Sequence, residues 1–479
     1  MRGTSRGRLE VSAIPPMSLG NRLDFLIHYP YGCIEQTTSG VFPQVYLTHL
    51  LRLSPSRKEE VDKNIKAGIA RVKLFQTAGG GFAYWPGQAE VNEWGTNYAG
   101  HFLLEAEKAG YSLPAELMQN WKIYQQTKAR DWNGGDAAAS LTQSYRLMLL
   151  ALAGSPELGA MNRMRQRMGL DAAAQWNLAT AYYLAGQREV AQQMTKTLNK
   201  DARRYREQNG TFGSTLRDQA VILLALSTMD RKAEATALVK TISDRLASED
   251  QLTTQEIAYS MVAMARYTGQ GSNSARVKFS WRLNGGKWED VSEESPVWQT
   301  ELAEVSKGKL ELKNKGGAIL YPRLILDGIP QQEDTTSAAN GVAVRVSYTT
   351  LDGLLLDPAK IEQGTDFIAK VMVKNTGATD YEQMAITQIF PSGWEIHNTR
   401  LDGSGAGGVT PTWQDFRDDR VFTFYDLKRS STKTFHVLLN ASYQGRYYLP
   451  TVVTGAMYDP TIQGRQGGKW IQVVAAAGN

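Results

Sequence analysis

The sequence contains 479 residues, which suffices for about three domains of ordinary size. Hydrophobic residues make up 42% and charged residues 21%, so packed cores are expected and a globally disordered chain is excluded. The formal net charge of +5 is too small over this length to indicate a nucleic-acid partner. No apolar run approaches the roughly 18 residues that a membrane span needs, so we expect no direct membrane insertion.

The first eight residues are basic but have no apolar stretch behind the positive charge, so they do not form a signal peptide. We interpret them as an expression scar or as the cut end of a longer chain. Residues 8–13 alternate between apolar and polar side chains, which predicts a short strand.

Residues 23–267 follow a helical period, with apolar side chains at i, i+3, i+4 and i+7. Almost wholly apolar helices recur, each after a short polar segment that usually contains threonine and that we expect to be an N-cap. These helices are predicted at 41–51, 99–109, 145–153, 176–184, 219–229 and 256–267. More polar stretches, such as 59–76 and 115–127, lie between them. Because helices that are apolar all round must be enclosed by others, the alternation predicts an α/α-toroid of about six hairpins.

From about residue 277 the period changes to two, which is typical of strands. Strands are predicted at 277–283, 309–313 and 320–326, and residues 331–341 form a polar linker. A second set follows at 342–349, 367–373, 384–389, 421–425, 434–439 and 447–453, which indicates an antiparallel sandwich. We expect residues 8–13 to pair with the strands at 277–330, so that the helical ring is an insertion within a small β domain.

The chain has a single cysteine, Cys33, which excludes an intramolecular disulfide and a cysteine-based zinc cage. The five histidines do not cluster as metal ligands, and no motif indicates a cofactor. We therefore expect neither a metal nor a cofactor.

Cys33 and Gln36 are three residues apart, so on a helical turn their β-carbons lie about 5–6 Å apart on one face. Attack of the thiolate on the Gln36 amide carbon, with loss of ammonia, would give an internal thioester. The start of a helix lowers the pKa of a thiol and would assist this closure. The alternative is that Cys33 is a small buried hydrophobe beside an unrelated glutamine.

Survival of a thioester requires exclusion of water, and aromatic side chains near the motif are candidates for this shield: Tyr29, Tyr31, Phe82, Trp85 and Trp94. The aromatic loops are more simply explained as core plugs at one end of the barrel, and we favour that interpretation. Pro30 and Gly32 are candidates for an approach turn before the cysteine. Glu35 is expected to point away from the Cys33–Gln36 face, and we count it as motif support and leave its role open.

The segment Tyr29-Pro30-Tyr31-Gly32-Cys33-Ile34-Glu35-Gln36, followed by Thr37-Thr38-Ser39, resembles the thioester motif of the alpha-2-macroglobulin and complement superfamily, and most closely its bacterial branch. The resemblance extends along the chain from about residue 8. It implies an α+β multidomain fold, in which an α/α-toroid thioester domain is inserted in a CUB-like β domain and followed by a macroglobulin-type antiparallel β-sandwich. The expected boundaries are 1–13 for the N-terminal strand of the CUB-like domain, 14–270 for the toroid, 271–335 for the rest of the CUB-like domain and 341–479 for the sandwich.

The resemblance also implies a function. In this family a protease cleaves a bait segment, and the exposed thioester acylates a nucleophile on the attacker. Cys33 would carry the leaving sulfur and Gln36 the acyl carbon, giving a broad-spectrum protease inhibitor that reacts once and is not an enzyme. The bait region and the upstream macroglobulin domains are missing, so we expect a C-terminal fragment whose partners are those domains and target proteases. The expected location is the periplasm, with a lipid-anchored parent.

Complement members that acylate hydroxyls use a histidine about a hundred residues beyond the cysteine, whereas residues 141–150 contain none. His28, His49 and His101 do not occupy that place and are predicted to be hydrogen-bonded structural residues. We therefore expect reaction with lysine amines. One alternative stays open, a non-covalent scaffold that binds proteins or peptides through the helical ring without a functional thioester.

Overall fold

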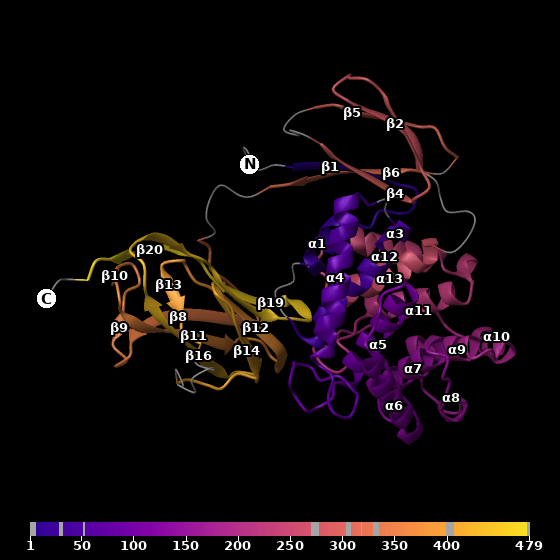
Figure 1. Cartoon of the computed structure of the whole chain (residues 1–479), viewed down its shortest axis with the longest axis horizontal. Coiled ribbons are helices and arrows are strands. Elements are labelled where there is room, and N and C mark those ends of the chain that lie inside the picture. The colour runs from indigo at the N-terminus through magenta and orange to yellow at the C-terminus, as the bar shows by residue number, and fades with distance from the viewer. Residues whose placement is uncertain are drawn as a thin grey trace. The chain divides into compact units, whose positions relative to one another are not determined.

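The computed structural model describes residues 6–27, 32–50, 53–269, 277–302, 308–317, 319–328, 335–398 and 407–476. The chain divides into two compact units (Figure 1). The first unit contains residues 1–206 and 210–329, and the second contains residues 207–209 and 330–479. Among the described residues, no helix is both long enough and apolar enough to cross a membrane.

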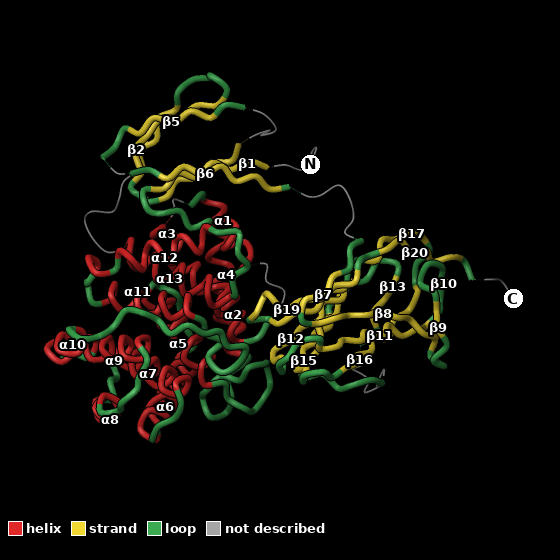
Figure 2. The backbone as a smooth tube through the Cα atoms, turned by 180° about the vertical axis from the view of Figure 1, so that it is seen from behind, coloured by secondary structure: helices red, strands yellow, loops and turns green. Residues whose placement is uncertain are grey.

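The helices of the first unit gather into one helical body (Figure 2). Their contacts arrange them as a double ring, which confirms the predicted α/α-toroid. Each inner helix packs against the next and the last packs against the first, and their side chains are buried on nearly all sides. The inner helices are α2 (Ile34–Val41), α5 (Glu93–Lys108), α7 (Ala137–Leu152), α9 (Ala172–Leu184), α11 (Thr215–Thr228) and α13 (Thr254–Gly269). The outer helices have one exposed face and are α4 (Pro55–Lys73), α6 (Ala115–Asp131), α8 (Leu158–Arg165), α10 (Arg188–Thr195) and α12 (Thr236–Ala247). Helix α1 (Leu19–Ile27) precedes the ring.

Most of the polar segments that were predicted to be N-caps lie inside the helices, so that prediction was wrong. Helix α5 is capped by Asn92 and α7 by Asp136, each through a side-chain oxygen that accepts a backbone N–H. The polar residues of the first turns instead bond to neighbouring helices. Asn97 Nδ2 donates to the Thr142 carbonyl at 2.8 Å, and Asn97 Oδ1 accepts from Gln125 at 2.6 Å.

The prediction of the first apolar helix, at 41–51, was also wrong. Helix α2 starts earlier and ends at Val41, and it is followed by the 3-10 segment η1 (Phe42–Tyr46) and by α3 (Leu47–Leu50). The reason is Pro43, which has no backbone N–H to donate to the carbonyl four residues before it.

Two three-stranded antiparallel sheets complete the first unit. Strand β1 (Arg6–Ser12) pairs with β4 (Val297–Leu302) and β6 (Tyr321–Asp327), as the alternation at residues 8–13 predicted. The other sheet joins β2 (Val277–Leu283), β3 (Glu289–Glu293) and β5 (Leu310–Asn314). Leu9 and Val11 share a buried cluster with Val277 and Phe279, so the two sheets enclose one core. The helical ring therefore lies in sequence between strands that pair with each other.

The second unit is mainly antiparallel β structure with buried apolar clusters between its strands, as predicted. Its long strands are β8 (Val342–Thr350), β11 (Asp366–Asn375), β12 (Tyr381–Ile389), β15 (Arg420–Leu427) and β16 (Thr432–Ala441). Shorter strands are β9 (Leu355–Leu356), β10 (Ile361–Glu362), β13 (Trp394–Ile396), β14 (Trp413–Phe416), β19 (Asp459–Gln466) and β20 (Lys469–Val474). The short strand β10 pairs with β20 in parallel.

Two predictions in this unit need correction. The single strand expected at 447–453 is two strands in different sheets, β17 (Gly445–Leu449) and β18 (Val452–Ala456), because Pro450 between them cannot donate to a ladder. The end of the expected linker at 331–341 is strand β7 (Ala338–Asn340), which pairs with β19, while residues 331–334 lie outside the described residues.

Candidate functional site

Cys33 and Gln36 meet at the start of α2. Cys33 is the N-cap residue, with an extended backbone, and its Sγ accepts a hydrogen bond from the Gln36 N–H at 3.4 Å. The side chain of Cys33 is 0% exposed and that of Gln36 is 3% exposed. The structure thus brings the two predicted residues together in a turn that is buried from solvent. A sulfur at this place faces the positive end of the helix dipole, which favours its anionic form.

Three neighbouring elements hold this turn. The Ile34 N–H donates to the Tyr84 carbonyl at 3.0 Å, which ties the turn to the loop before α5. Arg71 on α4 donates to the Gly32 carbonyl at 3.4 Å. Gly95 lets α5 approach, since a β-carbon there would lie 2.5 Å from Ile34 Cγ2. The Cys33–Gln36 turn is therefore anchored by its surroundings rather than by its own short helix.

Glu35 lies between the two residues and is fully buried. Its carboxylate accepts hydrogen bonds from Ser39 Oγ at 2.6 Å and from Thr254 Oγ1 at 2.9 and 3.0 Å. Ser39 Oγ is also 3.1 Å from the hydroxyl of Tyr98 on α5. The sequence indicated Glu35 only as motif support and did not indicate Thr254, because 219 residues separate the two and no local pattern links them.

The proposed aromatic shield divides into two parts. Phe82, Trp85 and Trp94 are all buried, at 0%, 3% and 2% exposure. Phe82 and Trp85 flank Tyr84, whose carbonyl holds Ile34, and the Trp85 and Tyr84 rings meet edge to face at 5.2 Å. The ring of Trp94 instead lies 4.3 Å from the guanidinium of Arg217, at the centre of a buried polar cluster. Of the other motif residues, Tyr29, Pro30 and Tyr31 lie outside the described residues.

That cluster is centred on a buried cation that sequence reasoning missed. Arg217 is 0% exposed and donates to Asp218 Oδ1 at 2.7 Å and to Gln255 Oε1 at 3.1 Å. Burial alone would lower the pKa of Arg217, but Tyr205 and Asp218 raise it above its ordinary value. The adjacent Arg217 and Asp218 at the start of an apolar helix were the signal, and we interpreted them as an N-cap.

His101 is a hydrogen-bonded structural residue, as predicted. It is 3% exposed, its Nδ1 lies 2.8 Å from the Tyr145 hydroxyl, and its ring meets Phe42 edge to face at 4.9 Å. Burial lowers the pKa of His101 to about 4, so the ring is neutral at physiological pH. His28 and the side chain of His49 lie outside what the structure describes.

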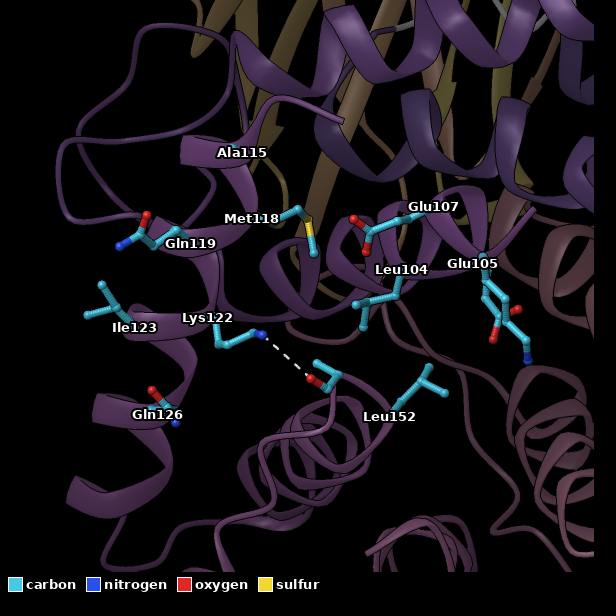
Figure 3. Close-up of a pocket in the computed structure, with 12 residues that line it drawn as sticks. Leu104, Glu105, Glu107, Ala115, Met118, Gln119, Lys122, Ile123, Gln126 and Leu152 are labelled. Atoms are coloured by element: carbon cyan, nitrogen blue, oxygen red, sulfur yellow. Dashed lines mark hydrogen bonds between the residues drawn. The ribbon is translucent and has the colours of Figure 1, made fainter. Parts of the chain in front are cut away.

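A surface cavity of about 660 Å³ lies between α5, α6 and the end of α7 (Figure 3). Leu104, Met118 and Ile123 line it, and Lys122 crosses it to donate to the Ala153 carbonyl at 3.5 Å. No residue of the Cys33–Gln36 turn lines this cavity, so it is not the candidate reactive site. Within the described ranges, no three His, Cys, Asp or Glu side chains come together as metal ligands.

Two family models match the chain. Residues 11–133 match the A-macroglobulin TED domain, and residues 341–461 match the bacterial Alpha-2-macroglobulin MG10 domain. Among curated proteins, the alpha-2-macroglobulin of Escherichia coli (strain K12) is 26% identical over 95% of this chain and 29% of its own length. That of Xylella fastidiosa (strain Temecula1) is 25% identical over 95% of this chain and 30% of its own length. The chain thus spans less than a third of these relatives.

Solved structures share the fold. Native alpha-2-macroglobulin from E. coli, spanning domain MG7 to the C-terminus, has a TM-score of 0.82 at 24% identity and covers 98% of this chain and 77% of its own. Salmonella alpha-2-macroglobulin reacted with methylamine has a TM-score of 0.83 at 23% identity and covers 99% of this chain and 32% of its own. Two domain models, relatives aligned along 95% of the sequence and the common fold all identify this chain as similar to the C-terminal part of the bacterial alpha-2-macroglobulins.

Proposed function

We propose that Cys33 and Gln36 form an internal thioester that captures amines. Closure joins Cys33 Sγ to the side-chain carbonyl carbon of Gln36 and releases the amide nitrogen as ammonia, which also takes up the thiol proton. An attacking amine then forms an amide with the same carbon, and the sulfur leaves to become a thiol. The observation that carries this proposal is the buried contact of Cys33 with the Gln36 N–H at 3.4 Å.

The burial of both side chains supports a bond that survives in water until it is exposed. The start of α2 supports the departure of sulfur, because the helix dipole stabilises a thiolate there. A Salmonella alpha-2-macroglobulin was solved after reaction with methylamine, and we propose the same class of reaction for this chain.

In the cell this chemistry would serve protease inhibition. As part of a longer protein, the chain would trap proteases covalently through their lysine amines after cleavage of a bait segment, and it would react once rather than turn over. Its partners would then be target proteases and the upstream macroglobulin domains. The location that fits this role is the periplasm, with a lipid-anchored parent.

We also propose a domain division on the same basis. Residues 1–13 and 271–335 would form the CUB-like domain, residues 14–270 the thioester domain, and residues 341–479 the macroglobulin-type sandwich. The antiparallel pairing of β1 with β4 and β6 supports this insertion.

Methylamine labelling followed by peptide mapping tests the proposal. We expect one methylamine to be joined to residue 36 and one new thiol to appear at Cys33 in the same molecules. Cys33→Ser and Gln36→Asn should abolish both signals, because the first removes the sulfur and the second shortens the acyl arm. Gln192→Asn, on the exposed face of α10, is the matched control and should react as the parent does. Absence of the label together with a thiol present before treatment would instead favour the non-covalent scaffold.

A further inference from the structure

The carboxylate of Glu35 is buried inside the turn that would carry the thioester. It is 0% exposed and adjoins Gln36 in the chain. Taking a carboxylate out of water is unfavourable unless other donors replace the hydrogen bonds of water. The conformation of this turn therefore depends on the groups that donate to Glu35.

Two hydroxyls of the described residues, those of Ser39 and Thr254, donate to Glu35, and they act differently. Ser39 belongs to α2 itself, so its 2.6 Å bond to Oε1 is internal to the helix. Thr254 belongs to α13, and its Oγ1 lies 3.0 Å from one carboxylate oxygen and 2.9 Å from the other. Because a hydroxyl has one proton, Thr254 shares it between the two oxygens. This contact joins the first inner helix to the last one, where the ring closes.

The start of α13 presents Thr254 rigidly. The Thr253 N–H donates to Glu256 Oε2 at 2.9 Å, and the Glu256 N–H donates to Thr253 Oγ1 at 3.2 Å. This reciprocal pair is a capping box. Glu256 is held in turn by Ser214 Oγ at 2.7 Å. The chain is therefore held just before Thr254, at Thr253, and just after it, at Glu256.

Helix α2 needs such an anchor. It has eight residues, and a helix this short has little stability of its own in water. Closure of the thioester requires particular side-chain rotamers at Cys33 and Gln36, and rotation of the first turn would separate them. An anchor on Glu35, one residue before Gln36, restricts that rotation directly.

We propose that Thr254 is a positioning residue for the thioester, which it serves by holding Glu35 and thereby the first turn of α2. The inference rests on the proposed function, because it concerns the same bond. Thr254 acts through Glu35 rather than on the reacting atoms, so its loss should loosen the turn without removing either reactive group.

The test compares three variants. Thr254→Val removes the hydroxyl and keeps the shape, and Thr254→Ser restores the hydroxyl. Thr180→Val is the matched control, because Thr180 is 3% exposed on inner helix α9 and its hydroxyl donates, among the residues that the structure describes, to the Trp176 carbonyl of its own helix at 2.8 Å. The measurements are the fraction of chains with a closed thioester by intact mass, the rate of methylamine uptake and the midpoint of thermal unfolding.

We expect Thr254→Val to lower the closed fraction and to raise the rate of methylamine uptake about tenfold, in line with the loss of a hydrogen bond to a charged group. Thr254→Ser should match the parent in both, and so should Thr180→Val. If the valine substitutions acted only by lowering stability in general, the unfolding midpoints of both variants would fall. Their rates of methylamine uptake would then stay equal to each other. Equal reaction rates for Thr254→Val and Thr180→Val would overturn the inference.

A parent chain that never closes the thioester would defeat the proposed function but would leave the inference about Thr254 testable. Alkylation of Cys33 by iodoacetamide then reports the looseness of the turn, and Thr254→Val should react about tenfold faster than Thr180→Val. Equal alkylation rates would overturn it. If the valine variant does not fold, Thr254→Ala removes the same hydroxyl without placing a methyl group against the carboxylate, and the same comparisons apply.

Discussion

The sulfur of Cys33 lies 3.4 Å from the backbone nitrogen of Gln36, at a helix start where both side chains are closed off from solvent. The contact between Cys33 and Gln36 needs only one turn of helix. That turn keeps its conformation because α4, α5 and the Tyr84 loop contact it from outside. The chemistry that we propose is therefore a property of the surrounding ring as much as of the two residues.

Heating should break the chain at the reactive turn. With the carbonyl carbon of Gln36 activated as a thioester, the backbone nitrogen of the same residue can attack it, release the Cys33 thiol and form a cyclic imide. Hydrolysis of that imide on its Glu35 side breaks the peptide bond between Glu35 and Gln36. Two fragments on a denaturing gel are expected, with a new blocked N-terminus at residue 36. Chains treated with methylamine first should stay intact, and fragmentation of Cys33→Ser would contradict this origin.

Amines should outcompete alcohols for the acyl group. The stretch 141–150, on inner helix α7, contains no histidine to activate a hydroxyl. His101 is buried and hydrogen-bonded to the Tyr145 hydroxyl, and burial lowers its pKa to about 4. In a mixture of methylamine and glycerol, we expect methylamine to dominate the product at residue 36, as read by peptide mass. Preferential labelling by glycerol would refute direct aminolysis.

Acid should destabilise the helical unit through His101. Its pKa falls from 6.5 to about 4 on burial, so the unfolded state binds a proton first as the pH drops. The contribution of His101 to the free energy of unfolding is fully present above pH 6.5. It is lost as the pH falls towards 4, and the total loss is about 3 kcal/mol. Urea unfolding followed by the helical circular dichroism signal measures it. His101→Gln should flatten this part of the profile, whereas His436→Gln in the second unit should leave it unchanged, and identical profiles for the parent and His101→Gln would contradict the assignment.

Loss of the Arg217 guanidinium should strongly lower the free energy of unfolding. Arg217→Met leaves the buried Asp218 without the cation that donates to it at 2.7 Å, and breaking such a buried pair costs about 3–5 kcal/mol. Arg231→Met is the matched control, since its ion pair with Glu234 lies partly in solvent and is worth at most about 1 kcal/mol. Thermal unfolding of the two variants compares them. Similar unfolding midpoints would show that the Arg217 cluster contributes little to the ring.

The sequence predicts the architecture better than it predicts the polar interior. Apolar periodicity identifies five of the six inner helices of the described ring but misses α2, and the spacing of Cys33 and Gln36 places both on one face of a turn, because these depend on local geometry. The starts of the helices were misplaced, because residues such as Asn97 and Arg217 look like caps but bond across the ring. Thr254 could not be linked to Glu35, because only ring closure brings them together.

The intact mass of freshly purified protein, prepared without amine buffers, tests the central claim most directly. A closed thioester predicts a mass lower than the sequence mass by one ammonia, while Cys33→Ala shows its full calculated mass and keeps a similar unfolding midpoint. A parent chain that retains its full mass and an alkylatable Cys33 would contradict the account.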